Sequence, residues 1–432
     1  MNLGPEFRLF CLALRQPRRA DDMAEMRRLA VAGPRWDTMV RGARRHRVAA
    51  GLVQGLQACG TPHLPDDVIT KLRKLSVANA RRSLAQIAEL RRLAQLFAAA
   101  GIRVLVLKGA ALAVQLYGDP GARVARDIDL LVDPDQFAEA RRLLRQAGYV
   151  QRQGFPSAQR SAAYQRRIKE IEFLDPATGG MVELHHRLTD NPYLLECDFS
   201  SLWGEREEIN LGDLTVATLP RQRLPLYLCV HGADHCWAKL QWLVDFAAAM
   251  RSQNVDDALQ SATAAGLRGP FMHALLLSHD WLGLPLGDSA VAACRGSSAV
   301  ARCAWLLARA YSATEWYADP AQDSWQRLWR DSLWTRLYRF SVKSDWRYRR
   351  SQLGREWFSP ADHEAMPLPE ALSWLYPLVR PWGWLIRRRS LPQWRKAPPL
   401  VAPGLTTQSL TAPSLTSRSL TAPSPPAPGS AS

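Results

Sequence analysis

The pair of carboxylates in Asp127-Ile128-Asp129 is the feature of this sequence that most directly suggests chemistry. The pair precedes the apolar run Leu130–Val132, which predicts that it lies at the start of a buried strand. Residues two apart on a strand project to the same face. Two carboxylates on one face repel each other unless a cation lies between them, and hard divalent cations prefer oxygen ligands. The spacing therefore predicts a divalent metal site, and two solvated acids are the simpler alternative.

A short strand, a glycine turn and a helix are predicted directly before the acidic pair. Arg103–Leu107 is the apolar strand, Gly109 follows it, and Ala111–Tyr117 has the composition of a helix. Glycine at such a turn lets phosphate approach the backbone N–H groups of the helix N-terminus, where the dipole favours anions. Gly109 and Ala110 are therefore candidate phosphate-binding residues. Lys108 either adds a fixed positive charge to them or is a surface lysine.

A third carboxylate is predicted further along the chain. After a helix over Gln136–Ala147 come two strand-like runs, Ile168–Leu174 and Met181–His186. The residues between them, Asp175–Gly180, are typical of a hairpin loop. Glu183 lies on the second run, and a neighbouring strand would bring it beside the aspartates. The alternative is that Glu183 is a charge on an edge strand.

Basic residues near these motifs are candidates for binding a triphosphate. Arg123 and Arg126 either contact phosphate or balance the charge of the acids. Further along, His231 and His235 stand four residues apart on one predicted helix face. A zinc protease motif requires Glu directly after the first His, where this chain has Gly232. Zinc binding by these two histidines is therefore not favoured.

A set of short motifs carries a resemblance to a known family. They are Leu107-Lys108-Gly109-Ala110, Leu116-Tyr117-Gly118, Arg123, Asp127-Ile128-Asp129-Leu130-Leu131-Val132, Gly148-Tyr149 and Glu183-Leu184-His185. The segment from Val104 to about His186 resembles the nucleotidyltransferase fold of the DNA polymerase β superfamily. Within it, the segment is most similar to a bacterial family of uncharacterised nucleotidyltransferases. The likeness extends more weakly to the helical flanks and so covers most of residues 1–290.

Two details depart from the superfamily pattern. The turn contains Ala110, where Ser or Gly is usual, and so lacks a hydroxyl that would contact phosphate. The interval from Gly109 to Asp127 is also longer than in the commonest version. The resemblance nevertheless implies an α/β (α+β) fold, in which a mixed sheet is flanked by N-terminal and C-terminal helical regions.

The resemblance also implies a reaction. It is the Mg²⁺-dependent transfer of a nucleoside monophosphate from an NTP to a hydroxyl or phosphate, with release of pyrophosphate. Asp127, Asp129 and Glu183 would hold two Mg²⁺ ions, for which Mn²⁺ is an alternative, and Glu183 would accept the proton of the nucleophile. Lys108, Gly109 and Ala110 would hold the β- and γ-phosphates.

A helical domain after the sheet would close over the nucleotide, again by resemblance. His235 or Lys239 would then touch phosphate, and Trp237 or Trp242 would stack on the base or pack beside it. The alternative is that both tryptophans belong to the hydrophobic core and that His231 is an ordinary helix histidine.

The charge balance limits the choice of partners. The 432 residues include 56 Lys and Arg against 40 Asp and Glu, a net charge of +16 that attracts NTPs, nucleic acid or an anionic membrane. A bias of the coding sequence towards Arg, Ala and Leu is the alternative explanation. The basic residues are spread along the chain, so a small molecule, peptide or saccharide is favoured over nucleic acid as the acceptor. A non-catalytic nucleotide-binding scaffold is the remaining alternative.

Cysteine usage and hydropathy indicate the compartment. The seven cysteines are odd in number and include no Cys-X-X-Cys, which argues against a disulfide framework and against a zinc site. Arg8 interrupts the apolar run Phe7–Leu14, so no signal-peptide core is recognised. No apolar run approaches the roughly 20 residues that cross a bilayer. A cytoplasmic protein is expected, with peripheral attachment to the inner face of the membrane as an alternative.

The predicted organisation has five parts. Residues 1–100 are expected to be helical, residues 101–220 to form the nucleotidyltransferase core, and residues 221–295 to form a helical lid. Residues 296–400 hold eleven of the sixteen tryptophans among many arginines, which is typical of a membrane interface, a protein partner interface or a plain core. Residues 401–432 repeat Ser-Leu-Thr-Ala-Pro and are predicted to be disordered.

Overall fold

The first hundred residues form five helices. The longest begins after Pro65, and Asp66 and Asp67 in its first turn interact favourably with the helix dipole. Arg47 takes a left-handed conformation with φ 60° and separates two shorter helices. The helices are α1 (Pro5–Leu14), α2 (Ala20–Val31), α3 (Trp36–His46), α4 (Ala49–Ala58) and α5 (Asp66–Ala99).

A mixed sheet of seven strands follows, in the order β3-β4-β5-β2-β1-β7-β6. Pairs β2/β5 and β1/β7 are parallel and the other neighbouring pairs are antiparallel. The predicted α/β (α+β) fold with a mixed sheet is therefore confirmed. The strands are β1 (Val104–Val106), β2 (Asp127–Val132), β3 (Val150–Gln151), β4 (Glu170–Leu174), β5 (Met181–His185), β6 (Glu207–Leu211) and β7 (Leu214–Thr218).

Helices connect these strands and continue after the sheet. Those within the sheet region are α6 (Gly109–Tyr117), the 3₁₀ turn η1 (Pro134–Gln136), α7 (Phe137–Gln146) and α9 (Phe199–Gly204). Those after it are α10 (Leu224–Asp234), α11 (Leu240–Met250), α12 (Val255–Ala264), α13 (Arg268–Leu282), α14 (Asp288–Gly296), α15 (Ser298–Tyr311), α16 (Trp325–Ser341) and α17 (Trp346–Trp357).

The computed structural model describes residues 4–60, 64–152, 168–311, 316 and 325–357, together with single positions between 368 and 382. The predicted disordered tail, residues 401–432, lies outside the described residues. The finer five-part division stays a prediction. Within the described part, every helix is too short or too polar to cross a bilayer.

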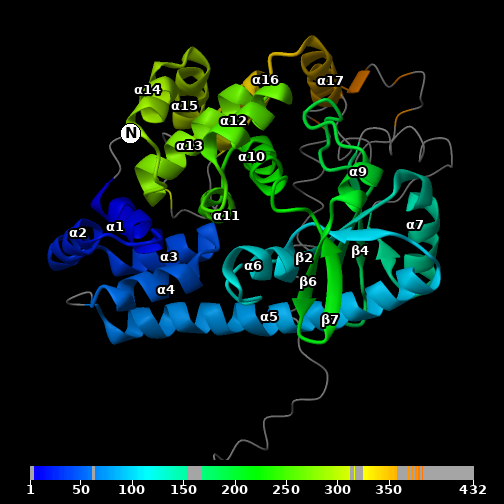
Figure 1. The fold of residues 1–432 in the computed structure, drawn as a ribbon, viewed down its shortest axis with the longest axis horizontal. Coiled ribbons are helices and arrows are strands. Elements are labelled where there is room, and N and C mark those ends of the chain that lie inside the picture. The colour runs from blue at the N-terminus through cyan, green and yellow to red at the C-terminus, as the bar shows by residue number, and fades with distance from the viewer. Residues whose placement is uncertain are drawn as a thin grey trace, which may run out of the picture. The chain divides into compact units, whose positions relative to one another are not determined.

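Helix α5 links the N-terminal helices to the sheet. It runs beneath α3 and α4 at one end and beneath the sheet region at the other (Figure 1), where it contacts α6, α7 and β2. Three of its side chains bind the loop that leads into β2. Ser83 Oγ donates to the carbonyl of Pro120 at 2.9 Å, Asn79 Nδ2 donates to the carbonyl of Gly121 at 2.8 Å, and Gln86 Nε2 donates to the carbonyl of Asp127 at 3.3 Å. One rigid helix therefore fixes the entrance to β2.

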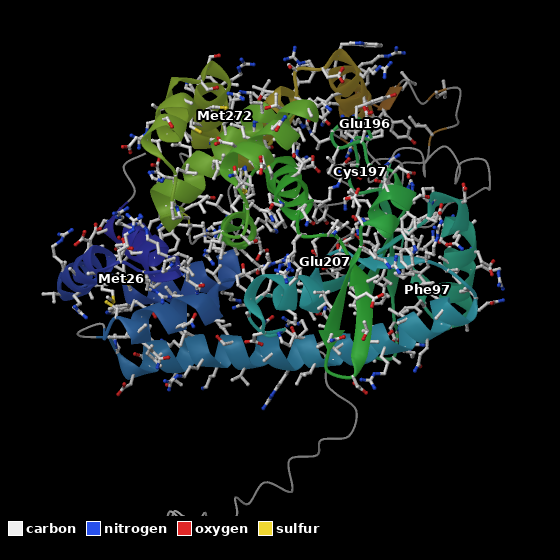
Figure 2. All side chains as sticks on the ribbon, viewed as in Figure 1. Met26, Phe97, Glu196, Cys197, Glu207 and Met272 are labelled. Atoms are coloured by element: carbon white, nitrogen blue, oxygen red, sulfur yellow. The ribbon has the colours of Figure 1, made fainter. Side chains whose placement is uncertain are left out.

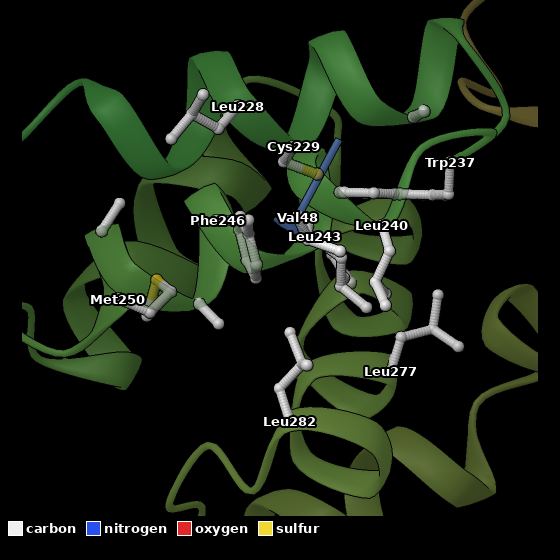
Figure 3. Close-up of a cluster of buried hydrophobic side chains, with 14 of the residues drawn as sticks. Val48, Leu228, Cys229, Trp237, Leu240, Leu243, Phe246, Met250, Leu277 and Leu282 are labelled. Atoms are coloured by element: carbon white, nitrogen blue, oxygen red, sulfur yellow. The ribbon is translucent and has the colours of Figure 1, made fainter. Parts of the chain in front are cut away.

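The hydrophobic side chains form three clusters, represented in Figure 2 by Met26, Phe97 and Met272. The largest joins the N-terminal helices to α10, α11 and α13, and the second packs α5 and α7 against the sheet. Trp237 is buried in the largest cluster, 6.2 Å from the ring of Phe246 (Figure 3). The interpretation of Trp237 as a core residue is therefore confirmed.

The tryptophans of the C-terminal region divide between core and surface. Trp316 packs against Phe7 and Phe10 with ring centroids 5.4 and 5.0 Å apart. Trp305 and Trp346, by contrast, are 49% and 65% exposed. A core role thus accounts for Trp316, and an interface role for the exposed tryptophans stays a prediction.

Candidate active site

Pairing of β2 with β5 brings two of the predicted carboxylates together. The strands run parallel with Asp129 opposite Glu183, so both side chains project from the same face of the sheet. The Asp129 side chain is 3% exposed and that of Glu183 is 18% exposed. Asp127 pairs with Met181 at the start of β2 and is only half-buried. The site is therefore centred on Asp129 and Glu183, with Asp127 at its edge.

His185 completes this cluster, although the sequence analysis assigned it no role. It lies two residues after Glu183 on β5 and so shares the same face. Its Nε2 lies 3.3 Å from Asp129 Oδ1, 3.5 Å from Glu183 Oε2 and 3.1 Å from Glu170 Oε2. The spacing Glu-X-His on a predicted strand was the available signal. The contribution of Glu170 depends on the register between β4 and β5, which no local pattern encodes.

The pKa of Asp129 is shifted downward, whereas the pKa values of the two glutamates beside it are shifted upward. Burial alone would raise the pKa of Asp129, but the charge of Lys108 and the adjacent His185 imidazole hold it well below its usual value. Burial, followed by the negative charges of Asp129 and Asp127, raises the pKa of Glu183 to about 8. Burial also raises the pKa of Glu170. Neighbouring buried carboxylates cannot all ionise at little cost, so Asp129 carries the charge and Glu183 retains a proton near neutral pH.

Lys108 lies inside the site and not on the surface. It is 8% exposed, and its Nζ donates to Asp129 Oδ1 at 2.6 Å. Burial disfavours a charged lysine, yet the negative charge of Asp129 raises the pKa of Lys108 well above its usual value. The alternative of a surface lysine is therefore wrong. The Lys108 ammonium group is therefore charged at neutral pH and lies directly against Asp129.

The donor set fits a divalent cation. Asp129, Glu183 and His185 each offer a ligand atom, and these atoms all lie within 4.8 Å of one another. No other group of this kind occurs in the part of the chain that the structure describes, and Asp127 is not a member of it. Both ring nitrogens of His185 are buried without a well-aligned hydrogen bond to any described residue, as expected of a side chain awaiting another partner. Two carboxylates and one imidazole suit a divalent metal ion.

The glycine turn lies directly beside the acidic strand. Gly109 begins α6 with φ 68°, a conformation that favours glycine, and a Cβ placed on it would lie 4.0 Å from that of Ala125. The N-terminus of α6, with the N–H groups of Gly109 and Ala110, is therefore adjacent to the residues that lead into Asp127. Arg126, between Ala125 and Asp127, is exposed at this point. The structure thus brings the predicted phosphate-binding residues next to the predicted metal ligands.

Arg123 has a different partner. Its Nε donates to Asp245 Oδ2 at 2.8 Å, and the two side chains are 5% and 1% exposed. Tyr117 donates its hydroxyl proton to the other Asp245 oxygen at 2.7 Å. Gln241, one turn earlier on α11, donates to the carbonyl of Val124 at 3.0 Å. These contacts fasten the loop before β2 to α11, so Arg123 positions this loop, and its predicted contact with triphosphate stays a prediction.

One face of α10 is oriented toward the site. Tyr227 and His231 are four residues apart, and the charges that act on both include those of Lys108 and Asp129. Burial, then the positive charge of Lys108, lowers the pKa of His231 well below its usual value. Burial lowers the pKa of His235 to about 4. Both histidines are therefore neutral at pH 7.

The remaining predicted lid residues are Trp242 and Lys239. The rings of His231 and His235 lie 4.7 Å apart, and the Trp242 ring lies 4.9 Å from that of His235. Lys239 precedes α11 and is half-buried, and its positive charge acts on His46 of α3. Trp242 and His235 thus form an aromatic cluster next to the site, whereas Lys239 lies towards the N-terminal helices.

Comparisons with known proteins identify the family. A family model described as uncharacterised nucleotidyltransferase matches residues 32–283, more than half of the chain. The matched segment contains the N-terminal helices from α3 onward, the whole sheet and the helices over the site. Neither the curated proteins nor the solved structures give a match. The chain belongs to the uncharacterised nucleotidyltransferase family and is a transferase.

Proposed function

We propose that this protein transfers a nucleoside monophosphate from an NTP to a hydroxyl or phosphate group of a small-molecule, peptide or saccharide acceptor, with Mg²⁺ as cofactor. The observation that carries the proposal is the pairing of Asp129 with Glu183 across parallel strands beside the Gly109 turn. Paired carboxylates next to a backbone phosphate cradle suit metal-assisted nucleotidyl transfer. Membership of the nucleotidyltransferase family supports the same class of reaction.

Asp129, Glu183 and Asp127 are the proposed ligands of two divalent cations. Bound there, Mg²⁺ would neutralise the charge that develops on the triphosphate and on the departing pyrophosphate. His185 adds an imidazole to the donor set, which extends the choice of metals towards transition ions such as Mn²⁺. Glu183, opposite Asp129 on the neighbouring strand, would accept the proton of the attacking hydroxyl.

The triphosphate is proposed to lie at the N-terminus of α6. The N–H groups of Gly109 and Ala110 would bind phosphate oxygens, with Lys108 and Arg126 as neighbouring cations. His235, directly after α10, and Lys239, directly before α11, would also contact the nucleotide. Ala110 is buried and its side chain has no hydroxyl group. It would therefore contact phosphate through its backbone N–H alone.

We also propose a cytoplasmic location and a partner-binding surface on α15 and α17. The exposed tryptophans of α15 and α17 lie in an arginine-rich sequence, a composition that suits an anionic membrane surface or a protein partner. Nucleic acid is not favoured as the acceptor, because the basic residues are spread along the chain and are not gathered in one arm or motif.

Label transfer tests the proposal directly. The full chain is incubated with each NTP labelled at the α-phosphate, with Mg²⁺, and with separate small-molecule, peptide, saccharide and nucleic-acid fractions of a cell extract. We expect label to enter one of the first three fractions. Asp129→Asn should reduce transfer roughly 10²-fold or more, because it removes charge that acts on the transition state.

The exposed Asp135 provides a matched control, since Asp135→Asn makes the same chemical change just beyond β2. It should leave transfer unchanged. Label in the nucleic-acid fraction alone would favour a nucleic-acid-modifying enzyme. Absence of label from every fraction, with folded protein, would favour a non-catalytic scaffold.

A further inference from the structure

The chain leaves the site as an irregular loop after His185, and this loop turns back onto the sheet. Asp190 Oδ1 accepts a hydrogen bond from the backbone N–H of Lys169 at 3.2 Å, and the carbonyl of Lys169 accepts one from the N–H of His186 at 3.0 Å. Lys169 directly precedes Glu170, which pairs with His185 across β4 and β5. The loop therefore fixes the two strand ends from which Glu170 and His185 project.

An ion pair connects this loop to α17. Arg355 Nη2 lies 3.2 Å from Asp190 Oδ2, and the two side chains are 27% and 28% exposed. Burial would raise the pKa of Asp190, but the charges of Arg355 and then of Lys169 lower it to about 2, so the pair is ionised at neutral pH. Lys169 also pairs with Glu170, whose Oε2 lies 3.1 Å from His185 Nε2. Contacts therefore run without interruption from Arg355 on α17 to His185 in the site.

A buried amide fastens the same loop to α17 at a second point. Asn191 Nδ2 donates to the carbonyl of Tyr348 at 3.1 Å and to Gln352 Oε1 at 3.3 Å. Its Oδ1 accepts from the N–H of Tyr193 at 3.2 Å, so both ends of the amide are satisfied. Lys343, shortly before α17, donates from Nζ to the carbonyl of Tyr193 at 2.7 Å. The loop thus takes several of its hydrogen-bond partners from α17 and from the residues that lead into it.

Helix α16 joins the same assembly to the end of α10. Arg339 Nε donates to the carbonyl of Asp234, the last residue of α10, at 2.6 Å, and His235 follows directly. The Tyr348 hydroxyl of α17 in turn donates to the carbonyl of Arg339. The two helices are therefore linked to each other, to the exit of β5 and to the end of α10.

Both helices lie beyond residues 32–283, the segment that the family model matches. Their contacts with the site are therefore a property of this chain that family membership does not supply. Residues behind the ligands commonly orient metal-binding side chains and tune the affinity for the metal. The contacts that lead from Arg355 to His185 have this form.

We infer that α16 and α17 form a positioning element of the site. Arg355, acting through Asp190, holds the ends of β4 and β5 so that His185 faces the carboxylates, and Asn191 secures the loop between the strand and the helix. The inference rests on the proposed function, because it assigns these residues to the geometry of the proposed metal site. Both Arg355 and Asn191 act through other residues, so they are positioning residues. Part of the region rich in tryptophan and arginine thereby gains a role within the site.

Arg355→Gln tests this inference through two measurements on the full chain. Hydrogen–deuterium exchange, followed by mass spectrometry of peptides from β4 and β5, measures how readily these strand ends open. Calorimetric titration with Mn²⁺ alone, without NTP, measures whether the donor atoms are still held in place. We expect faster exchange in β4 and β5, and a Kd for Mn²⁺ raised about tenfold, as for other lost contacts behind a metal ligand. Arg355→Lys keeps the charge and should restore most of the affinity.

Arg350→Gln is the matched control, since Arg350 is exposed on the same helix and the substitution changes the net charge equally. It should leave both the exchange and the Kd at the wild-type values. The inference is overturned if folded Arg355→Gln binds Mn²⁺ with wild-type affinity, or if the control loses as much affinity as Arg355→Gln. If Arg355→Gln does not fold, Asp190→Asn, which keeps the shape of the side chain and loses the ion pair, decides by the same criterion.

The two measurements separate this inference from the proposed function, because the exchange measurement requires no metal. If wild type binds Mn²⁺ and Arg355→Gln binds it equally, the positioning role fails and the proposed metal site stands. If wild type binds no Mn²⁺, the proposed metal site fails, and the exchange alone decides. Faster exchange in β4 and β5 of Arg355→Gln, absent from the control, would then support the positioning role, and unchanged exchange would overturn it.

Discussion

Lys108 and His185 both place a nitrogen against the same carboxylate oxygen of Asp129, at 2.6 and 3.3 Å. Asp129 is thus stabilised as an anion. Burial, followed by the negative charge of Asp129, raises the pKa of the neighbouring Glu183 to about 8. This asymmetry gives the two carboxylates different roles. Asp129 stays ionised, whereas Glu183 exchanges a proton near neutral pH.

Glu183→Gln should change how stability depends on pH. The unfolded pKa of Glu is about 4.3, and the folded value is about 8, so between these values the folded state binds more protons. The Glu183 contribution to stability is therefore fully present below about pH 4 and is lost as the pH rises to about 8. We expect the Tm of Glu183→Gln, relative to wild type, to rise by a few degrees between pH 5 and pH 8.5 in EDTA, given about 1 °C per kcal/mol for a unit of about 400 residues.

The exposed Glu196 serves as the control for this measurement (Figure 2). Glu196→Gln should follow wild type at every pH. An unchanged Tm difference between Glu183→Gln and wild type across this range would show that Glu183 is ionised in the folded protein and would contradict its raised pKa.

At the scale of elements, the loop before β2 is held between two helices that lie far apart in sequence. Helix α5 binds it through Asn79, Ser83 and Gln86, and α11 binds it through Gln241 and Asp245. Because this loop also adjoins the Gly109 turn, its position sets the distance between that turn and the aspartates of β2. The helices therefore do more than cover the sheet, since they fix the geometry of the site.

Asp245→Asn tests whether α11 holds the loop before β2 in place. Removing one partner of a buried ion pair leaves the Arg123 charge unpaired, which costs about 3–5 kcal/mol of stability. We expect a clear loss in the free energy of unfolding by denaturant and, at temperatures where the variant is folded, weaker NTP binding, because the loop before β2 is released.

Asp256→Asn, at an exposed position of α12, is the matched control and should change stability by less than about 0.5 kcal/mol. If the Asp245→Asn variant is destabilised but binds NTP with wild-type affinity, the role of α11 in positioning this loop is contradicted. An unchanged free energy of unfolding would contradict the buried ion pair itself.

At the scale of the molecule, local signals in the sequence predicted the fold and the centre of the site. The alternation at Asp127 and Asp129, the glycine turn at Gly109 and the hairpin at Asp175–Gly180 each depend on a few adjacent residues, and each is present. The hairpin of β6 and β7 was not singled out, although Gly212 with φ 74° marks its turn.

The remaining features depend on contacts between distant residues. Arg123 meets Asp245 across 122 positions, and Lys108 turns inward to Asp129 instead of facing solvent. Sequence reasoning therefore found the residue types of the site and missed several of their partners.

We propose that one NTP binds through a cation held by Asp129 and Glu183. Isothermal titration of each NTP into the full chain, with Mg²⁺ and with EDTA, tests it most directly, using wild type, Asp129→Asn, Glu183→Gln and the control Asp135→Asn. We predict that one NTP binds wild type and the control at least tenfold more tightly with Mg²⁺, and that both site variants lose this gain. Equal affinity with and without Mg²⁺ in folded wild type, or a gain that survives in both site variants, would contradict the claim.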